Sequence, residues 1–210
     1  MFIHSIFHRK SQKPAANRMG FALRTVRPAR KDAGPFLKNI PGVREKCVGT
    51  DRLYFAVRSL GVQGRDHVLQ YAFADDRGNV VMSAFVRSEA PSALLLGCPA
   101  EDLAMEPLDP EAFDFIAAKL CGGATLVAYQ RVLQGGLLPF GAARSAAGVE
   151  CAWRRFQQTA RALGLSYSPR DPLTLNDCLS LAGLPVPISE DAALRALAIR
   201  SLWRWMDEVD

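Results

Sequence analysis

Positive charge is concentrated in the first fifty residues, which hold eleven Lys or Arg and two acidic residues, a net charge of +9. The whole chain of 210 residues has a formal net charge of +5, so the remainder is mildly acidic. Grouped cationic side chains bind polyanions such as nucleic acid or anionic lipid. A solvated arm that keeps the protein soluble is the alternative interpretation. The cations of this arm that we expect to bind nucleic acid are Arg24, Arg27, Arg30 and Lys31.

Metal-ligating and nucleophilic side chains are few and widely spaced. No CxxC or HExxH pattern occurs, which excludes a zinc finger and a zinc-protease helix. The odd number of cysteines and the lack of an apolar signal segment predict free thiols in a reducing cytoplasm. The arginine-rich start also suits a transit peptide, with Met19 as an alternative start. The histidines and cysteines are His4, His8, His67, Cys47, Cys98, Cys121, Cys151 and Cys178.

Carboxylates are the other candidates for chemistry, because pairs of them hold divalent metals or transfer protons. Asp75 and Asp76 precede Gly78 in a predicted turn, and turn formation explains them. Asp177 falls in a predicted helix over 174–182, where a surface or capping role is expected. These acids by themselves predict no metal site.

The elements that position these side chains follow from hydrophobic periodicity. Strand-type patterns occupy 53–57, 68–74 and 80–86, and the last two are joined by a hairpin turn. Apolar runs predict two further strands, at 124–129 and 149–152. The strands thus divide into a hairpin group and a later group that needs crossover connections.

Helices are predicted between and after the later strands. Asp109 and Pro110 indicate the start of a helix that runs to about Leu120, with Asp109 as its cap. In the last helix a 3- and 4-residue spacing gives one buried face, and we expect it to begin at Ser189. The remaining helical segments are 132–147, 153–163 and 174–182.

This order of elements predicts an α/β fold with a mixed central sheet, antiparallel on one side and parallel on the other. The composition is ordinary for a globular protein, with 49% hydrophobic residues. The longest apolar runs fall far short of the ~18–20 residues that a membrane-spanning helix needs. We expect a basic, mostly irregular arm over 1–50 and one domain over 51–210.

Four stretches of the chain carry a family resemblance: LYFAVRSLGV at 53–62, HVLQYAFADDRGNVVMSAFV at 67–86, LVAYQRVLQGGLL at 126–138, and 173–205. They resemble the motifs of the DEDD 3′–5′ exonucleases, the family that contains the proofreading epsilon subunit of bacterial DNA polymerase III. The resemblance covers about residues 51–207 and implies an RNase H-like fold. In that family, four acids hold two divalent metals that clamp the scissile phosphate.

The resemblance puts unsuitable side chains at every metal-binding position. The family's four acids fall, in order, on Ala56, Arg58, Gln134 and Arg195, and its histidine base falls on Glu190. Alanine offers no ligand atom, and arginine cannot lose its proton to become a ligand. The resemblance therefore implies a pseudoenzyme without a metal cofactor.

An active exonuclease with displaced acids is the alternative, and it alone would use Mg²⁺ or Mn²⁺. Tyr167 and Asp171 have the spacing of the family's tyrosine variant, but Pro169 between them favours a loop over a helix face. A chance match of this short spacing is the preferred explanation.

Two interpretations remain for the arginines at the former metal positions. Arg58 and Arg195 could hold a nucleic-acid backbone directly, with fixed cations in place of the metals. They could instead pair with Glu190 and close the site, which is the preferred interpretation because buried charges need partners.

Core packing explains most aromatic residues, including Phe113, Phe115 and Trp153. Trp203 and Trp205 are two residues apart on a predicted helix, so one of them is expected to be exposed or at an interface with a partner or a second copy. The sequence therefore predicts a catalytically inactive, exonuclease-like protein that binds nucleic acid or a protein partner. Attachment of the basic arm to an anionic membrane surface is a third possibility.

Overall fold

A computed structural model describes residues 51–62, 65–87, 106–134, 136–167 and 173–210. The predicted basic arm, with Arg24, Arg27, Arg30 and Lys31, lies outside these described residues, and so does Asp171. The account below therefore concerns the predicted domain over 51–210.

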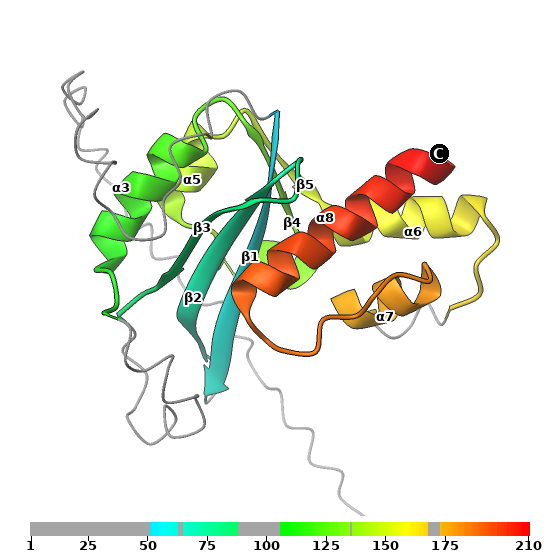
Figure 1. The fold of residues 1–210 in the computed structure, drawn as a ribbon, viewed down its shortest axis with the longest axis horizontal. Helices are drawn as coiled ribbons and strands as arrows, with labels where there is room; N and C mark the ends of the chain where they lie inside the picture. The colour runs from blue at the N-terminus through cyan, green and yellow to red at the C-terminus, as the bar shows by residue number, and fades with distance from the viewer. Residues whose placement is uncertain (1–50, 63–64, 88–105, 135, 168–172) are drawn as a thin grey trace, which may run out of the picture. The chain divides into compact units, whose positions relative to one another are not determined.

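A five-stranded mixed sheet forms the centre of this domain (Figure 1). The strand order is β3-β2-β1-β4-β5; β1 pairs antiparallel with β2 and parallel with β4. The pairing of β2 with β3 is antiparallel and that of β4 with β5 is parallel. This arrangement confirms the predicted α/β class with a mixed sheet. The strands are β1 (Arg52–Val62), β2 (Arg65–Asp75), β3 (Val80–Phe85), β4 (Thr125–Ala128) and β5 (Gly148–Cys151).

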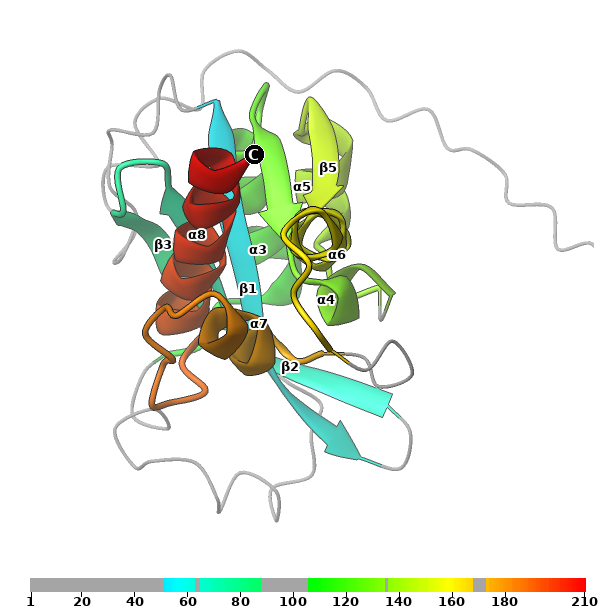
Figure 2. The same cartoon turned by 90° about the vertical axis from the view of Figure 1, so that its right-hand side faces the viewer.

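Helices cover both faces of the sheet (Figure 2). One face packs against α3 (Pro110–Leu120) and α5 (Phe140–Ser145). The other face packs against α6 (Ala152–Ala162), α7 (Leu175–Leu181) and α8 (Ala192–Val209).

The alternation of side chains along β1 separates the two cores. Leu53 and Phe55 lie in the core under α3, whereas Tyr54 and Ala56 lie in the core under α8. All four side chains are almost completely buried. Residues on the even-numbered side of β1 therefore face α8, and this is the side on which the candidate site is built.

The predicted helix over 132–147 is wrong, because the chain forms two short helices there. The first, α4 (Gln130–Gln134), ends before Gly136, which adopts a φ of +64° that favours glycine. The second, α5, begins after Pro139, a residue that cannot continue the ladder of α4. A glycine and a proline thus divide a segment whose apolar spacing alone suggested one helix.

The last helix starts three residues later than predicted. Asp191, not Ser189, is its N-cap, and one Asp191 carboxylate oxygen accepts hydrogen bonds from the backbone N–H groups of Ala193 and Leu194 at 2.8 and 3.1 Å. This carboxylate satisfies two of the backbone donors that a helix start leaves unpaired. The buried residues of α8 are Ala192, Ala196, Ala198, Ile199, Leu202, Trp203 and Met206, whereas Leu194 is 43% exposed.

We expected either Trp203 or Trp205 to be exposed or at an interface, but neither side chain is largely exposed. Trp203 is 3% exposed, and Trp205 is partly buried with its ring 6.0 Å from that of Phe156. The Trp205 ring packs against Phe156 of α6. The spacing of residues within α8 alone could not predict this contact with another helix. Phe115 is the reverse case, because it was predicted to be in the core and is 49% exposed.

Among the described residues, no helix is both long enough and apolar enough to cross a membrane. The predicted free thiols are observed at Cys121, Cys151 and Cys178, and those of Cys121 and Cys178 are buried in the core.

Candidate functional site

Three of the five residues singled out by the resemblance line one small cavity of about 80 Å³. Ala56 comes from β1, Glu190 precedes α8, and Arg195 lies in the first turns of α8. Arg58 lies two residues further along β1, opposite Gln70 of β2, and is not among the residues that line the cavity. Gln134 is the last residue of α4.

The charges in this cavity neutralise each other. An Arg195 guanidinium nitrogen donates a hydrogen bond to a Glu190 carboxylate oxygen, and the two form an ion pair. The Glu190 side chain is 68% exposed and the Arg195 side chain 30% exposed, so the pair lies at the mouth rather than in the interior. The predicted pairing with Glu190 is confirmed for Arg195, and that of Arg58 stays a prediction.

A partly buried tyrosine, Tyr129, lines the cavity. The Tyr129 hydroxyl donates a hydrogen bond to the carbonyl oxygen of Leu173 at 2.5 Å and lies 3.2 Å from the Cys178 sulfur. Burial, reinforced by the hydrogen bond with Cys178, raises the pKa of Tyr129 far above its usual value. Burial likewise raises the pKa of the Cys178 thiol to about 11. Both groups are therefore neutral near pH 7, and neither can act there as a charged base or nucleophile.

A buried glutamine holds the start of α8 over the sheet and so sets the geometry of the cavity. Gln70 of β2 is 2% exposed, and its side-chain nitrogen donates to a carboxylate oxygen of Asp191 at 3.0 Å. Its side-chain oxygen accepts from the backbone N–H of Ala192 at 3.0 Å. The same nitrogen donates to the Ser83 hydroxyl of β3 at 3.1 Å. One amide thus joins two strands to the helix that carries Arg195.

These residues do not fit a two-metal centre. Ala56 offers a methyl group where the resemblance expects the first acid, and Arg195 offers a cation where it expects the last. Divalent metals such as Mg²⁺ need several oxygen ligands and are repelled by a guanidinium group. Within the described ranges, no three His, Cys, Asp or Glu side chains are grouped so that they could hold a metal ion.

The other acidic candidates have structural roles, as predicted. Asp75 accepts hydrogen bonds from the backbone and side chain of Asn79 at 2.8 and 3.0 Å and stabilises the hairpin turn. Burial acts to raise the pKa of Asp75, but the hydrogen bonds from Asn79 outweigh it and hold this pKa below its usual value. Asp76 accepts a hydrogen bond from the Tyr54 hydroxyl at 2.6 Å, and Asp177 forms a capping box with Thr174.

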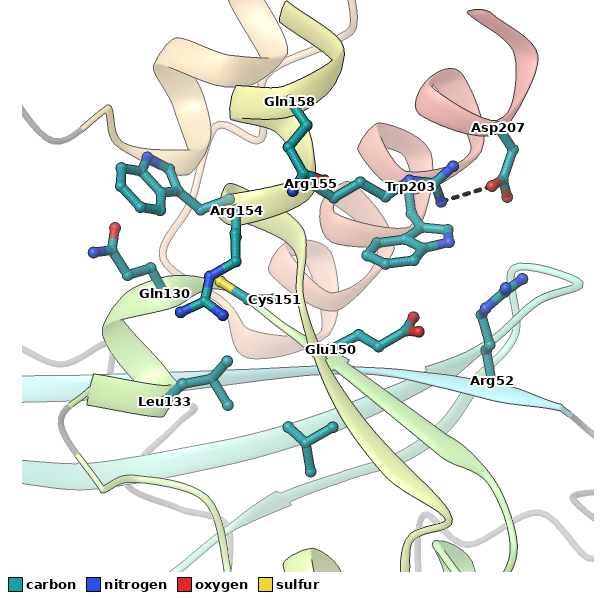
Figure 3. Close-up of a pocket in the computed structure, with 12 residues that line it drawn as sticks. Arg52, Gln130, Leu133, Glu150, Cys151, Arg154, Arg155, Gln158, Trp203 and Asp207 are labelled. Carbon is teal, nitrogen blue, oxygen red and sulfur yellow. Dashed lines mark hydrogen bonds and ion pairs between the residues drawn. The ribbon is translucent and has the colours of Figure 1, made fainter. Parts of the chain in front are cut away.

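A second and larger hollow, of about 660 Å³, was not predicted from the sequence (Figure 3). We call it the Arg–Trp groove. It lies beside β5, the last strand of the sheet, between α6, the end of α8 and α4. The residues that define it are Arg52, Glu150, Trp153, Arg154, Arg155 and Trp203.

The arginines of the groove differ in how they are neutralised. Arg155 forms ion pairs with Asp207 at 2.7 Å and Asp210 at 2.8 Å, and its guanidinium carbon lies 4.6 Å from the centre of the Trp203 ring. The guanidinium carbon of Arg52 lies 5.7 Å from the same ring. Arg154 is exposed and makes no hydrogen bond, ion pair or ring contact with any other residue that the structure describes.

Sequence reasoning missed this groove because its parts are far apart in the chain. The available signal was the run Trp153-Arg154-Arg155 at the start of α6, where two cations follow an aromatic residue. Trp153 was assigned to the core, but it is only partly buried and lies at the edge of the groove.

A scan against protein-family models finds no match to this chain, and a search of curated proteins finds no relative. The side chains and the fold therefore carry the functional argument.

Proposed function

We propose that this protein is a catalytically silent relative of the DEDD 3′–5′ exonucleases, with an RNase H-like fold, and that it binds nucleic acid. The observation that carries the proposal is the cavity in which Ala56, Glu190 and Arg195 meet. The resemblance assigned these residues to one site although they lie in two segments more than 130 positions apart in the sequence. The order of strands and helices on which the resemblance rests agrees with the order in the described residues, except that two short helices, α4 and α5, stand where one was predicted.

Catalytic silence follows from the chemistry of the side chains. Hydrolysis by this family needs two metals and a base that deprotonates water. Ala56 cannot bind a metal, and Arg195 is a cation engaged with Glu190. The only carboxylate at the family positions, that of Glu190, is already paired.

Binding of nucleic acid is supported by the distribution of charge. The net charge of +9 over residues 1–50 gives a polyanion a favourable partner even where the domain itself is mildly acidic. A protein that has lost the hydrolytic step but kept such cations can still bind a strand without cutting it.

A combined binding and cleavage assay tests the proposal. The full chain is incubated with a 5′-labelled single-stranded DNA and a matching RNA, with Mg²⁺, with Mn²⁺ or with a chelator. We expect a retarded band that weakens as salt rises and a strand that keeps its full length in every condition. Metal-dependent loss of 3′ nucleotides would contradict catalytic silence and support displaced acids. A strand that is neither bound nor cut would contradict nucleic-acid binding and leave a protein partner.

If cleavage occurs, two variants locate its origin. Asp171→Asn removes the acid of the sequence-derived alternative, whereas Glu190→Gln removes the carboxylate of the cavity. Cleavage that survives both variants requires neither candidate acid, and it still contradicts catalytic silence if it copurifies with the chain.

A further inference from the structure

The Arg–Trp groove has an unequal distribution of charge along its length. At one end, Glu150 extends toward Trp203 and Arg52, and the Arg155–Asp207 ion pair lies above them (Figure 3). At the other end, the Arg154 guanidinium points toward Gln130 and Leu133, away from the Glu150 carboxylate (Figure 3). The first end is balanced in charge, and the second carries a cation without a described partner.

We propose that the Arg154 end of this groove binds the phosphate backbone of a single-stranded nucleic acid. The inference rests on the proposed function for the class of ligand, but it assigns a site that is separate from the family cavity. Guanidinium groups bind phosphate through two parallel charge-assisted hydrogen bonds, which a free Arg154 can supply.

The groups around Arg154 are also suited to a nucleotide. The amide of Gln130 lies near the Arg154 guanidinium (Figure 3), and amides pair with base edges or sugar hydroxyls. The ring of Trp153 is partly exposed beside Arg154, and a partly exposed indole offers a surface on which one base can stack. Stacking of this kind requires an unpaired base, which favours a single strand over a duplex.

An acidic peptide fits less well. A peptide would extend the sheet by pairing with the outer side of β5, which is only four residues long. Glu150 lies within that strand and is exposed, so it would repel acidic side chains placed beside it. A nucleic-acid strand needs no backbone pairing with β5 and can keep its phosphates at the Arg154 end. The volume of about 660 Å³ lies within the range of ligand pockets, which is about 300–1,000 Å³.

The test compares two charge reversals on one helix in the full chain. Arg154→Glu changes the groove, and Arg161→Glu makes the same change at an exposed position in the last turn of α6, away from the groove. Because both chains keep the basic arm, the arm contributes equally to both. Affinity for fluorescein-labelled dT20 is measured by anisotropy at several salt concentrations.

We expect Arg154→Glu to bind dT20 about tenfold or more weakly than Arg161→Glu, since a phosphate contact is lost and a repulsion is added. Arg154→Gln should fall between wild type and Arg154→Glu, with a salt slope smaller by about 1. Equal affinities of the two charge-reversal variants would overturn the inference. Matching melting temperatures of the three variants show that folding does not cause the difference.

A competitor separates nucleic acid from acidic protein. Poly-glutamate of matched charge should bind only the basic arm. It should therefore displace dT20 equally well from wild type and from Arg161→Glu, and the affinity of the protein for poly-glutamate should not depend on Arg154. If Arg154→Glu weakens the affinity for poly-glutamate but leaves the affinity for dT20 unchanged, the inference is overturned in favour of an acidic partner. If wild type binds dT20 and the two charge-reversal variants bind it with equal affinity, the groove is refuted as a binding site but the proposed function is not. If wild type does not bind dT20, the proposed function is refuted as well.

Discussion

The cavity and the Arg–Trp groove lie toward opposite ends of α8. They differ in whether their arginines are paired with acidic side chains. The cavity is about 80 Å³ and holds an arginine that is paired with Glu190. The groove is about 660 Å³ and holds Arg154, which has no partner among the described residues. A site whose charges are satisfied internally has little left for a ligand, whereas an exposed cation without a partner can still bind one.

The comparison separates the site that the family resemblance assigned from the site whose accessible groups suit binding. Under the proposed function, the cavity corresponds to a hydrolytic site; in this chain Ala56 and the Glu190–Arg195 ion pair line it. The groove has no counterpart among the motifs that carry the resemblance, and its accessible groups suit binding. The account therefore predicts that changes near the cavity alter stability, and that changes in the groove alter accessibility and binding.

The reactivity of the cysteines should show the largest difference between the two regions. Cys178 contacts Tyr129 behind the cavity and is fully buried, and so is Cys121; burial raises the pKa of Cys121 to about 12. Cys151 is only partly buried and lines the groove. With a thiol reagent at pH 8, we expect Cys151 to be modified at least about a hundredfold faster than either buried thiol.

Peptide mapping by mass spectrometry assigns the rates to individual cysteines. Urea should expose the buried thiols and bring their rates to that of Cys151, which serves as the internal control. Fast modification of Cys178 in the native protein would contradict the closed cavity.

Removal of the buried glutamine should have the largest effect on stability. Gln70→Ala leaves the Ala192 N–H and the Asp191 carboxylate without this partner, and we expect a loss of about 2–3 kcal/mol in the free energy of unfolding. Ser83→Ala is the matched control, because it removes one hydrogen bond to the same side chain and should cost no more than about 1 kcal/mol. Urea denaturation measures both, and equal losses would refute the role of Gln70 as an anchor of α8.

The hydroxyl of Tyr129 should have a smaller effect. Tyr129→Phe keeps the ring but leaves the Leu173 carbonyl oxygen without this donor, so we expect a loss of about 1 kcal/mol. Tyr167→Phe, at a partly buried tyrosine for which no hydrogen bond is seen in the described structure, should leave the free energy of unfolding nearly unchanged. A cost for Tyr167→Phe as large as that for Tyr129→Phe would contradict a specific contribution from the cavity hydroxyl.

The smallest expected effect is a loss of stability at acid pH that depends on Asp210, the partner of the groove residue Arg155. Hydrogen bonds from Arg155 and Thr159 hold the pKa of Asp210 below its usual value. A carboxyl whose pKa is lowered by folding stabilises the folded state above its unfolded pKa, about 3.9, and loses that contribution as pH falls through the folded pKa. The melting temperature of wild type should therefore fall more steeply below about pH 4 than that of Asp210→Asn.

Glu208→Gln is the control for this pH series, because Glu208 is exposed and close by on the same helix. It should follow the wild-type profile. If the melting temperature of Asp210→Asn also falls with pH as steeply as that of wild type, the Asp210–Arg155 contact contributes nothing to stability.

Much of the fold could be predicted from local patterns. The alternation in β2 and β3 and the turn at Asp75–Asn79 defined the hairpin, and Pro110 at the first position of α3 marked the start of that helix. The errors arose where a longer-range contact decides the outcome. The start of α8 is one such place, because the bond between Gln70 and Asp191 joins residues 121 positions apart.

The two regions differed in how well sequence could find them. The cavity could be located because the resemblance supplied the positions that meet there. The groove could not, because Arg52, Arg154 and Trp203 come from β1, α6 and α8, and only the strand order brings those elements together. No spacing within one element predicts such a site.

The most direct test of catalytic silence in a former metal site is the response of the melting temperature to Mn²⁺. Wild type is compared with the full chain carrying Ala56→Asp and Arg195→Asp, which places acids beside Glu190 at two positions that the resemblance assigns to metal ligands. A ligand that binds only the folded state raises its melting temperature. We predict no Mn²⁺-dependent rise for wild type and a clear rise for the doubly substituted chain. A Mn²⁺-dependent rise in the melting temperature of wild type would contradict the account.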